Sequence, residues 1–438
     1  MLSTIKNAFK VKNIRGKILF TLMILVIYRI GAYITVPGVN AKALQSVSSS
    51  GLVSMLNIFS GGGLTNYSLF AMGVSPYITA QIVIQLLQMD IVPRFVEWSK
   101  QGEVGRRKLN QVTRWLTIVL AFFQSVGITA GFNALSPMHL VKNPSIGTYI
   151  SIGIILTGGS MLTTWMGDMI TDKGIGQGIS IIIFAGIIAD TPVGVKQLWQ
   201  TYIEGASGAD LIEGILFVLA VALVVLIIIT FVTWVQQAER RIPVQYTRRA
   251  TTSGKDSYLP LKVNVSGVIP VIFASSFIST PQTLLMFFQK SHGSDAWYRI
   301  MSNVFNMQTT DGAILYTFLI VMFTFFYAFV QVNPEKLAKN LEKQGSYIPD
   351  VWPGHETQDY VSNLLMRLST VGSLFLGVVA LIPLIAQNIW NLNESIGLGG
   401  TSLLIVVGVA IDTIRQVRGL MMKREYVGFI RTPRPNNL

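Results

Sequence analysis

Cysteine is absent from this chain of 438 residues. Its absence excludes disulfide bonds, cysteine-ligated zinc, iron–sulfur clusters and a thiol nucleophile. Charge is also scarce, because Asp, Glu, Lys and Arg make up 13% of the residues, whereas a soluble domain carries about 25%. Hydrophobic residues make up 51%. The composition therefore predicts a chain that lies mostly in lipid.

Long apolar segments recur along the chain and predict membrane-spanning helices. A helix rises about 1.5 Å per residue, so about 20 apolar residues cross a hydrocarbon core of about 30 Å. The clearest segment, from Ile215 to Val235, contains no charged residue. Nine more spans, for a total of ten, are expected to begin near Ile18, Leu69, Trp115, Tyr149, Ile175, Val263, Ala313, Leu368 and Gly397.

Positive charge predicts which side of the membrane each loop occupies. Lys and Arg collect in the N-terminal segment, in every second loop and in the C-terminal tail, as in segments that remain in the cytoplasm. We therefore expect both termini in the cytoplasm. The formal net charge of +13 then lies mainly on one face, where it can meet anionic membrane lipids, acidic proteins or ribosomal RNA.

Two of the expected cytoplasmic loops are long, at about 236–262 and 333–367. Loops of this length are uncommon unless they have a function. Both carry charges and turn formers, in Arg240-Arg241-Ile-Pro243 and in Pro349-Asp-Val-Trp-Pro353-Gly354. Each is therefore expected to form a protruding hairpin or finger with an interaction surface. A simple linker is the alternative.

The segment 52–65 is apolar but too short to cross a membrane, and three consecutive glycines interrupt it. A short broken helix at membrane depth is tolerated only inside protein or beside a water-filled cavity, because its backbone groups need partners. The segment therefore predicts a re-entrant or plugging element. An interfacial loop on the external side is the alternative.

Sequence patterns that would indicate catalysis are weak. Residues 205–208 have the spacing of an intramembrane serine protease motif, but all three histidines fall in expected loops. Residues 174–178 lack the preceding strand of a dinucleotide-binding fold. Ionisable residues within the expected spans amount to Arg29 and Asp412, both near span ends, which does not make a proton or sodium relay. We expect neither an enzyme nor a cofactor. A secondary transporter of small solutes is an alternative that these few ionisable residues do not favour.

Seven motifs follow one another along nearly the whole chain. They occupy Tyr28–Gly38, Phe70–Ile82, Gly102–Lys108, Asp172–Ser180, Glu239–Tyr246, Leu259–Asn264 and Gly399–Ile405. In this order they resemble motifs of the SecY/Sec61-alpha family of protein-conducting channels. A match to one motif would mean little, but seven ordered matches identify the chain as a member of that family.

The resemblance implies an all-α membrane protein with ten transmembrane helices. They would form two pseudo-symmetric five-helix halves, about residues 1–200 and 201–438, around an hourglass pore with a short plug helix. The implied function is to pass unfolded, signal-bearing polypeptides across the bacterial plasma (inner) membrane and to release transmembrane segments laterally into lipid.

The resemblance also implies an aliphatic ring at the waist of the pore. Its residues would be Val74, Ile78, Ile179, Ile183, Ile272 and Ile405. A narrow apolar constriction disfavours water and ions, yet it can deform around a passing chain without binding any side chain strongly. Ordinary helix packing is the alternative for each of these residues.

Other implied sites lie on either side of the waist. The segment 52–65 would be the plug, with Asn57, Phe59, Gly61, Gly62 and Gly63. Gln85 and Asn264 match polar positions that face each other across a lateral gate. The loops that bind partners would use Arg240, Arg241, Arg248, Arg249 and Trp352.

The implied partners are the small membrane subunits SecE and SecG, the motor ATPase SecA, the ribosome with its RNA, signal-bearing chains and membrane lipids. Arginine suits RNA phosphate and carboxylate alike. Trp352 departs from the family, which usually has Arg at this position before Pro-Gly. The loss of that cation changes how the loop can engage a partner but does not affect the fold.

Overall fold

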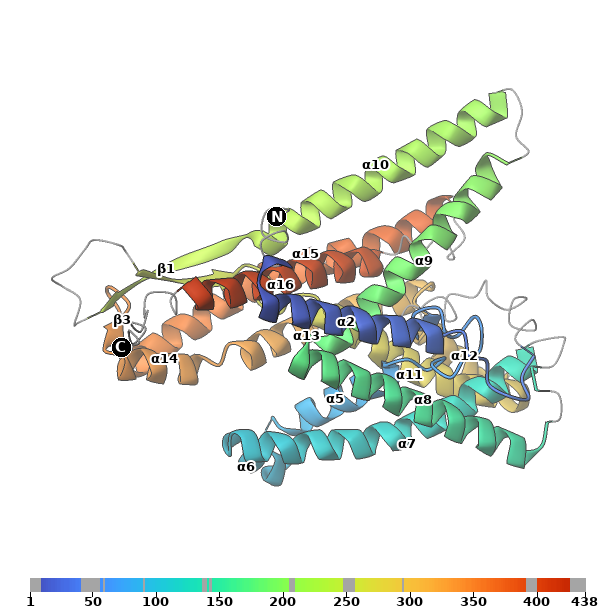
Figure 1. The fold of residues 1–438 in the computed structure, drawn as a ribbon, viewed down its shortest axis with the longest axis horizontal. Coiled ribbons are helices and arrows are strands. Elements are labelled where there is room, and N and C mark those ends of the chain that lie inside the picture. Colours follow the sequence, from blue (N-terminus) through green and yellow to red (C-terminus); the bar gives the residue numbers. More distant parts are fainter. Residues whose placement is uncertain are drawn as a thin grey trace, which may run out of the picture.

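The computed structural model describes residues 9–40, 56–57, 60–89, 91–135, 140–141, 144–204, 209–246, 257–293, 295–390 and 400–425. Most of them lie in long helices (Figure 1). The helices are α2 (Lys12–Gly31), α5 (Ser75–Leu87), α6 (Pro93–Lys100), α7 (Glu103–Leu135), α8 (Ile146–Lys173), α9 (Gly178–Tyr202), α10 (Ala209–Gln237), α11 (Ile269–His292), α12 (Ala296–Val304), α13 (Thr310–Gln331), α14 (Pro334–Lys343), α15 (His355–Trp390) and α16 (Gly400–Glu425). The strands are β1 (Glu239–Tyr246), β2 (Ser257–Lys262) and β3 (Ser346–Tyr347).

Seven helices in the described part of the chain are long and apolar enough to cross a membrane: α7, α8, α9, α10, α11, α13 and α15. The prediction of a helical membrane protein is therefore confirmed. The other three expected spans coincide with α2, α5 and α16, so the total of ten stays a prediction. At about 1.5 Å per residue, the 13 residues of α5 cannot cross the bilayer alone.

Helix α10 is the least buried of the seven apolar helices in the described part of the chain. Only 6% of its most apolar stretch is buried inside the chain, and Figure 1 shows it running along the outside of the bundle. A helix that is apolar on all sides and unburied by its own chain needs an apolar solvent. The composition of α10 and its position on the outside of the bundle therefore both indicate that it lies in lipid.

A small sheet interrupts the helical architecture after α10. Strands β1 and β2 pair antiparallel, and β3 adds to β1, giving the order β2-β1-β3. The predicted hairpin in the first long loop is thus confirmed, whereas the expectation of an all-α chain is wrong at this point. The physical reason is the period-two pattern of β1, in which Ile242 and Val244 are buried and their neighbours along the strand are exposed.

The second long loop is mostly helical. Helix α14 is followed by β3 and a turn, and α15 then begins at His355. Asp350 and Gly354 have positive φ angles of 65° and 101° within that turn. The two loops pack on one another, because Ile242 and Leu261 of the hairpin share an apolar cluster with Ile348, Val361 and Leu365.

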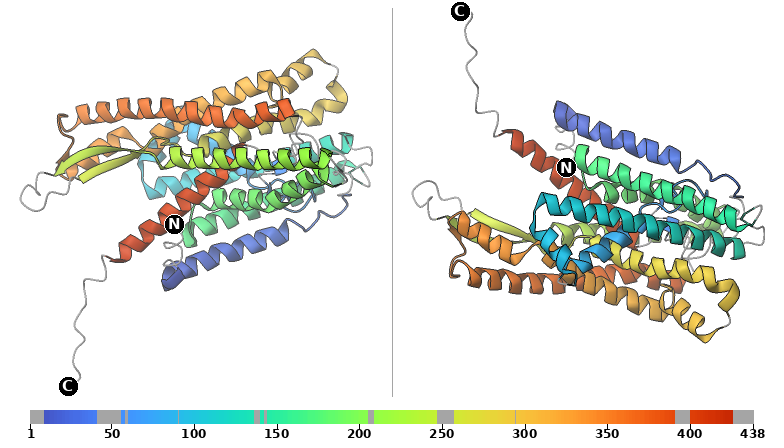
Figure 2. Two further views of the ribbon diagram at one scale, coloured as in Figure 1. Left: turned by 90° about the horizontal axis from the view of Figure 1, so that it is seen from above. Right: turned by 90° about the horizontal axis from the view of Figure 1, so that it is seen from below.

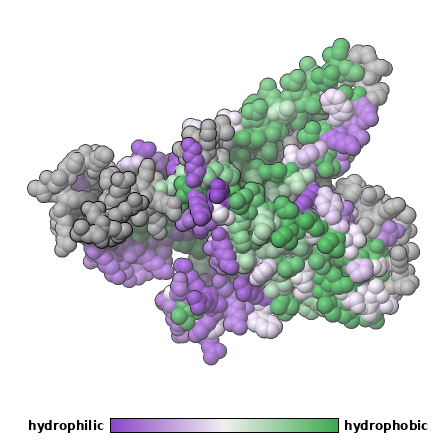
Figure 3. All heavy atoms as spheres, viewed as in Figure 1, coloured by the Kyte–Doolittle hydropathy of each residue, from purple (hydrophilic) through white to green (hydrophobic). Residues whose placement is uncertain are grey.

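The long helices run side by side with α16 crossing them at a slant (Figure 2). Hydrophilic residues gather at the end that carries α6 and α14, and hydrophobic residues cover the helices beyond it (Figure 3). We call this end, which also carries the β1–β2 hairpin, the polar end, and the opposite one the far end. The start of α2 and the last part of α16 meet near the polar end, since Ile14 clusters with Ile175 and Val417.

Candidate functional site

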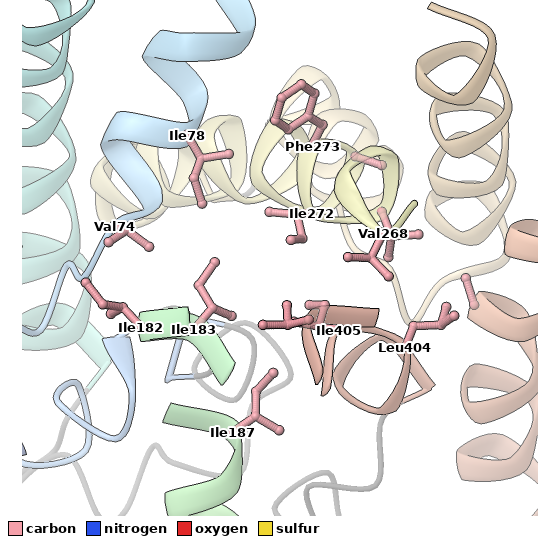
Figure 4. Packing of buried hydrophobic residues seen from close by; sticks show 14 of the residues in the cluster. Val74, Ile78, Ile182, Ile183, Ile187, Val268, Ile272, Phe273, Leu404 and Ile405 are labelled. Atoms are coloured by element: carbon pink, nitrogen blue, oxygen red, sulfur yellow. The ribbon is translucent and has the colours of Figure 1, made fainter. Parts of the chain in front are cut away.

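Aliphatic side chains from four helices converge at the centre of the bundle. Figure 4 shows Val74 and Ile78 of the α5 segment, Ile183 of α9, Ile272 of α11 and Ile405 of α16 around one space. They belong to the largest apolar cluster among the described residues. The structure thus brings together five of the six residues that were expected to form a ring, and we call these five the waist.

The waist is closed to water in this structure. The exposed fraction is 0% for Val74, 2% for Ile78, 1% for Ile183, 4% for Ile272 and 2% for Ile405. These side chains have no donor or acceptor group with which to replace the hydration of an ion. The waist is therefore a buried and wholly apolar contact between four helices.

The sixth expected ring residue, Ile179, lies one turn before Ile183 at the start of α9. It is partly buried and packs against the same apolar cluster. A methyl group added to Gly167 of α8 would lie 3.0 Å from Ile179 Cγ1, so this side chain contacts α8. Sequence reasoning missed Ile182, Ile187 and Leu404, which Figure 4 places around the same five residues. Isoleucine and leucine in a span carry no signal that separates them from ordinary packing residues.

The start of α5 is fixed onto α8 by polar contacts. Gly73, with φ at +52°, precedes Val74, the residue before the first turn of α5. The carbonyl oxygen of Gly73 accepts hydrogen bonds from Ser160 Oγ at 3.0 Å and from Thr163 Oγ1 at 3.1 Å. Both hydroxyl groups are buried. These bonds set the position from which Val74 enters the waist.

The residues expected to form a plug contact two charged residues. Asn57 Nδ2 donates to Asp190 Oδ2 of α9 at 3.0 Å, and Arg29 Nη1 of α2 donates to the carbonyl oxygen of Gly61 at 2.6 Å. A methyl group added to Gly62 would lie 3.0 Å from Asp190 Oδ1. Phe59 lies outside the described residues. We call the contacts of Arg29 and Asp190 with this segment the polar latch.

Asp190 was missing from the ionisable residues expected within the spans. Only Arg29 and Asp412 were expected there, yet α9 extends from Gly178 through Asp190 and Pro192 to Tyr202. Arg29 was expected only near a span end, but its guanidinium bonds to Gly61. Charged groups inside a bundle usually pair with one another or with backbone carbonyls. Here Arg29 bonds to a backbone carbonyl, and Asp190 accepts from the side-chain amide of Asn57.

Helices α5 and α7 meet α11 along a seam with a few polar contacts. The hydroxyl groups of Thr79 and Thr280 are 3.0 Å apart, and Gln124 Nε2 donates to Thr280 Oγ1 at 3.0 Å. Gly127 and Gly131 of α7 lie against α11. We call the contact of α5 and α7 with α11 the seam. Small residues four apart in a span allow two backbones to approach closely.

Gln85 and Asn264, which were expected to face each other across a gate, form no hydrogen bond with each other in the described part of the chain. Asn264 donates to the carbonyl oxygen of Gly267 at 2.9 Å and accepts from Ser266 Oγ at 3.2 Å. Gln85 has a buried Oε1 without a partner within the described structure. Thr79, Gln124 and Thr280, which sequence reasoning did not single out, link the helices across the seam.

The expected partner-binding residues lie at the polar end. Arg240 and Arg241 are exposed on β1, and the guanidinium of Arg241 lies 4.8 Å from the centre of the Tyr258 ring. Trp352 is 77% exposed. Arg248 and Arg249 lie outside the described residues. Both described arginines and the tryptophan can therefore reach a partner beyond the membrane surface.

Together these features define a helical membrane protein whose central helices meet at an apolar waist. Among the residues that the structure describes, no group of three or more His, Asp or Glu side chains could hold a metal ion. The SecY family model matches residues 68–414. This chain therefore belongs to the SecY family, and the family predicted from its motifs is confirmed. It is a channel subunit and not an enzyme.

Two further kinds of comparison support the family and the fold. The chain is 67% identical to "Protein translocase subunit SecY 1" of Lactobacillus kefiranofaciens subsp. kefiranofaciens, over 98% of this chain and 100% of that protein. Its fold is similar to the structure titled "The structure of a protein conducting channel", with a TM-score of 0.65, 18% identity and 95% of each chain covered. It is also similar to "Sec61 in the Canine ribosome-channel complex from the endoplasmic reticulum", with a TM-score of 0.60, 17% identity and 95% of each chain covered.

Proposed function

We propose that this member of the SecY family is the pore subunit of a protein translocase in a bacterial plasma membrane. It passes unfolded, signal-bearing polypeptides across the bilayer and releases apolar segments laterally into lipid. The observation that carries the proposal is the waist, in which residues from four separate helices close one apolar barrier. The translocase relatives supply the substrate class.

The waist suits a polypeptide better than a small solute. Apolar side chains bind no particular group of a passing chain, so substrates of many sequences can move through without being held. A transporter of small solutes would instead need a few placed polar groups at mid-membrane. The five waist residues are Val and Ile, which favours the polypeptide channel over that alternative.

The channel has ten spans in two halves, about residues 1–200 and 201–438, and the seam between α7 and α11 is its lateral gate. The seam joins helices from both halves, which is where a signal helix could leave the pore. An apolar helix inserted there would replace the few polar contacts across the seam. Its greater affinity for the open state would then shift the closed–open balance.

The segment 52–65 is the plug, and the polar latch holds it on the far side of the waist. The polar end faces the cytoplasm, because the positive charge collects there. Its hairpin and the turn around Trp352 bind SecA or the ribosome, while SecE and SecG pack against the helices from within the membrane. The fold of this chain is similar to that of Sec61 in a ribosome–channel complex, which supports the ribosome as one of these partners.

Reconstitution tests the function as a whole. The chain would be purified with its small subunits, placed in liposomes, and supplied with SecA, ATP and a signal-bearing preprotein. We expect the preprotein to become protected from added protease, and a preprotein without its signal to stay accessible. Saturable flux of a small solute, with no protection of the preprotein, would favour the transporter instead.

A further inference from the structure

The last part of α16 forms ion pairs with both strands of the hairpin. Asp412 Oδ1 lies 2.8 Å from Lys262 Nζ at the end of β2. Arg415 Nη2 lies 3.3 Å from Glu239 Oε1 at the start of β1. These contacts join residues that are 150 and more positions apart in the sequence. The base of the hairpin is therefore attached to a helix that belongs to the last span.

The two ion pairs lie next to each other. Glu239 and Lys262 are direct partners in the β1–β2 ladder, and Asp412 and Arg415 are three residues apart on α16, which places them on one helix face. The signs alternate from Glu239 to Lys262, Asp412 and Arg415, and we call this arrangement of two ion pairs the charge ring. A single exposed ion pair contributes little, but two neighbouring pairs between the same elements favour one orientation of the hairpin relative to α16.

The same part of α16 also contacts the turn before α9. Gln416 Oε1 accepts a hydrogen bond from the backbone nitrogen of Gly176 at 2.5 Å, and Arg415 Nη2 lies 3.5 Å from the carbonyl oxygen of Gln236 at the end of α10. The glycine lies two residues before the first residue of α9, which carries Ile183. One short stretch of α16 thus contacts the hairpin, the end of α10 and the start of α9.

Helix α16 leads from the charge ring directly to the waist. Ile405 is seven residues, or about 10 Å of helix, before Asp412, and both lie within the unbroken helix Gly400–Glu425. A cavity of about 480 Å³ adjoins the charge ring and is lined in part by Lys262, Asp412 and Gln416. The part of α16 at the charge ring therefore borders open space on this side.

We propose that the charge ring couples the hairpin to the waist, so that a partner that moves the hairpin also moves α16 and with it Ile405. Because α16 is one continuous helix, a movement at the charge ring is transmitted over a short distance to Ile405. The states of the hairpin and of the waist then influence one another. The inference rests on the proposed function, in which the hairpin binds a partner and Ile405 closes the pore. It assigns Asp412, Arg415, Glu239 and Lys262 as positioning residues that transmit partner binding.

The test uses the full chain with its small subunits, in liposomes, with purified SecA and a signal-bearing preprotein. Two quantities are measured for each variant: the Kd of SecA for the channel, and the rate at which the preprotein becomes protease-protected. We expect Asp412→Asn to leave the Kd within about twofold and to slow translocation by about fivefold or more. The fourfold variant Glu239→Lys, Lys262→Asp, Asp412→Lys and Arg415→Asp reverses every sign, keeps both ion pairs and the alternation of charge, and should recover most of the rate.

The matched control is Asp168→Asn, which removes the ion pair between Asp168 of α8 and Arg114 of α7, outside both long loops. It should change neither quantity. The proposal is overturned if Asp412→Asn translocates at the wild-type rate, if the charge-swapped variant is as slow as Asp412→Asn, or if the Kd rises in parallel with the loss of rate. If the wild-type channel itself neither binds SecA nor protects the preprotein, the proposed function fails instead of the coupling.

Discussion

Gly131 of α7 and Met286 of α11 lie so close that a methyl group added to the glycine would be 2.6 Å from Met286 Cβ. One turn earlier, a methyl group on Gly127 would be 3.3 Å from the carbonyl oxygen of Thr283. Close contact of this kind is a main source of helix association in lipid, where no hydrophobic force holds helices together. The seam is therefore held shut mainly by the fit of two backbones.

A larger side chain at Gly131 should open the seam. Leucine cannot fit against Met286 unless α7 and α11 move apart, so we expect Gly131→Leu to favour the open state. Weak signal sequences should then direct translocation several-fold better than in the parent channel. The matched control is Gly158→Leu in α8, where an added methyl group meets nothing within 4 Å. Equal behaviour of the two variants in protease-protection assays would contradict the assignment of the seam as the gate.

Loss of the polar latch should destabilise the closed plug. Asp190→Asn removes the carboxylate that accepts from Asn57 and that lies near Arg29. A hydrogen bond to a charged group contributes about 1.5–3 kcal/mol, so we expect about a tenfold or greater rise in the frequency of brief openings. Single-channel recording without substrate measures it. Asp311→Asn, an exposed acid at the start of α13, is the control, and an equal effect in both variants would rule the latch out.

Charge reversal at Arg241 should weaken partner binding and leave the fold intact. The residue is exposed on β1, and its main visible contact is the Tyr258 ring, which is worth about 0.5–1 kcal/mol at such a site. We expect Arg241→Glu to cost a few kcal/mol at most in affinity for SecA or the ribosome. Arg299→Glu, on α12 at the far end, controls for net charge. If both variants bind like wild type, the contact lies elsewhere.

The expected orientation can be tested directly because the chain contains no cysteine. A single His355→Cys at the polar end should react with an impermeant thiol reagent only after the cells are opened. Pro144→Cys, exposed just before α8, should react in intact cells. The reverse pattern would overturn the topology.

The helices were largely predictable from the sequence, because their length and composition follow from the thickness of the bilayer. The segment Ile215–Val235 corresponds to α10, which runs from Ala209 to Gln237. The hairpin was predictable as a protrusion from its charges and turn residues. Its strands were not expected, although the alternation of buried Ile242 and Val244 with exposed neighbours carried the signal.

The site was less predictable from residue chemistry. The waist residues were named through a family resemblance, since an isoleucine in a span has the same properties whether it faces a pore or a neighbour. The glycines of the seam depend on which helix packs against α7, and the charge ring depends on which strand end meets α16. Both are long-range pairings that no local pattern in a single sequence contains.

The waist closes the pore in the proposed function, so its side chains should set the resting ion conductance. The purified complex is placed in a planar bilayer without substrate, and Ile405→Asn and the pair Ile78→Asn with Ile272→Asn are compared with wild type. The control is Ile227→Asn on α10, a residue that is 58% exposed and faces lipid. Polar side chains in the waist lower the barrier to wetting and to ion dehydration, so we predict a clear rise in resting conductance for Ile405→Asn, a larger one for the pair, and none for Ile227→Asn. Unchanged conductance in well-folded waist variants would contradict the account.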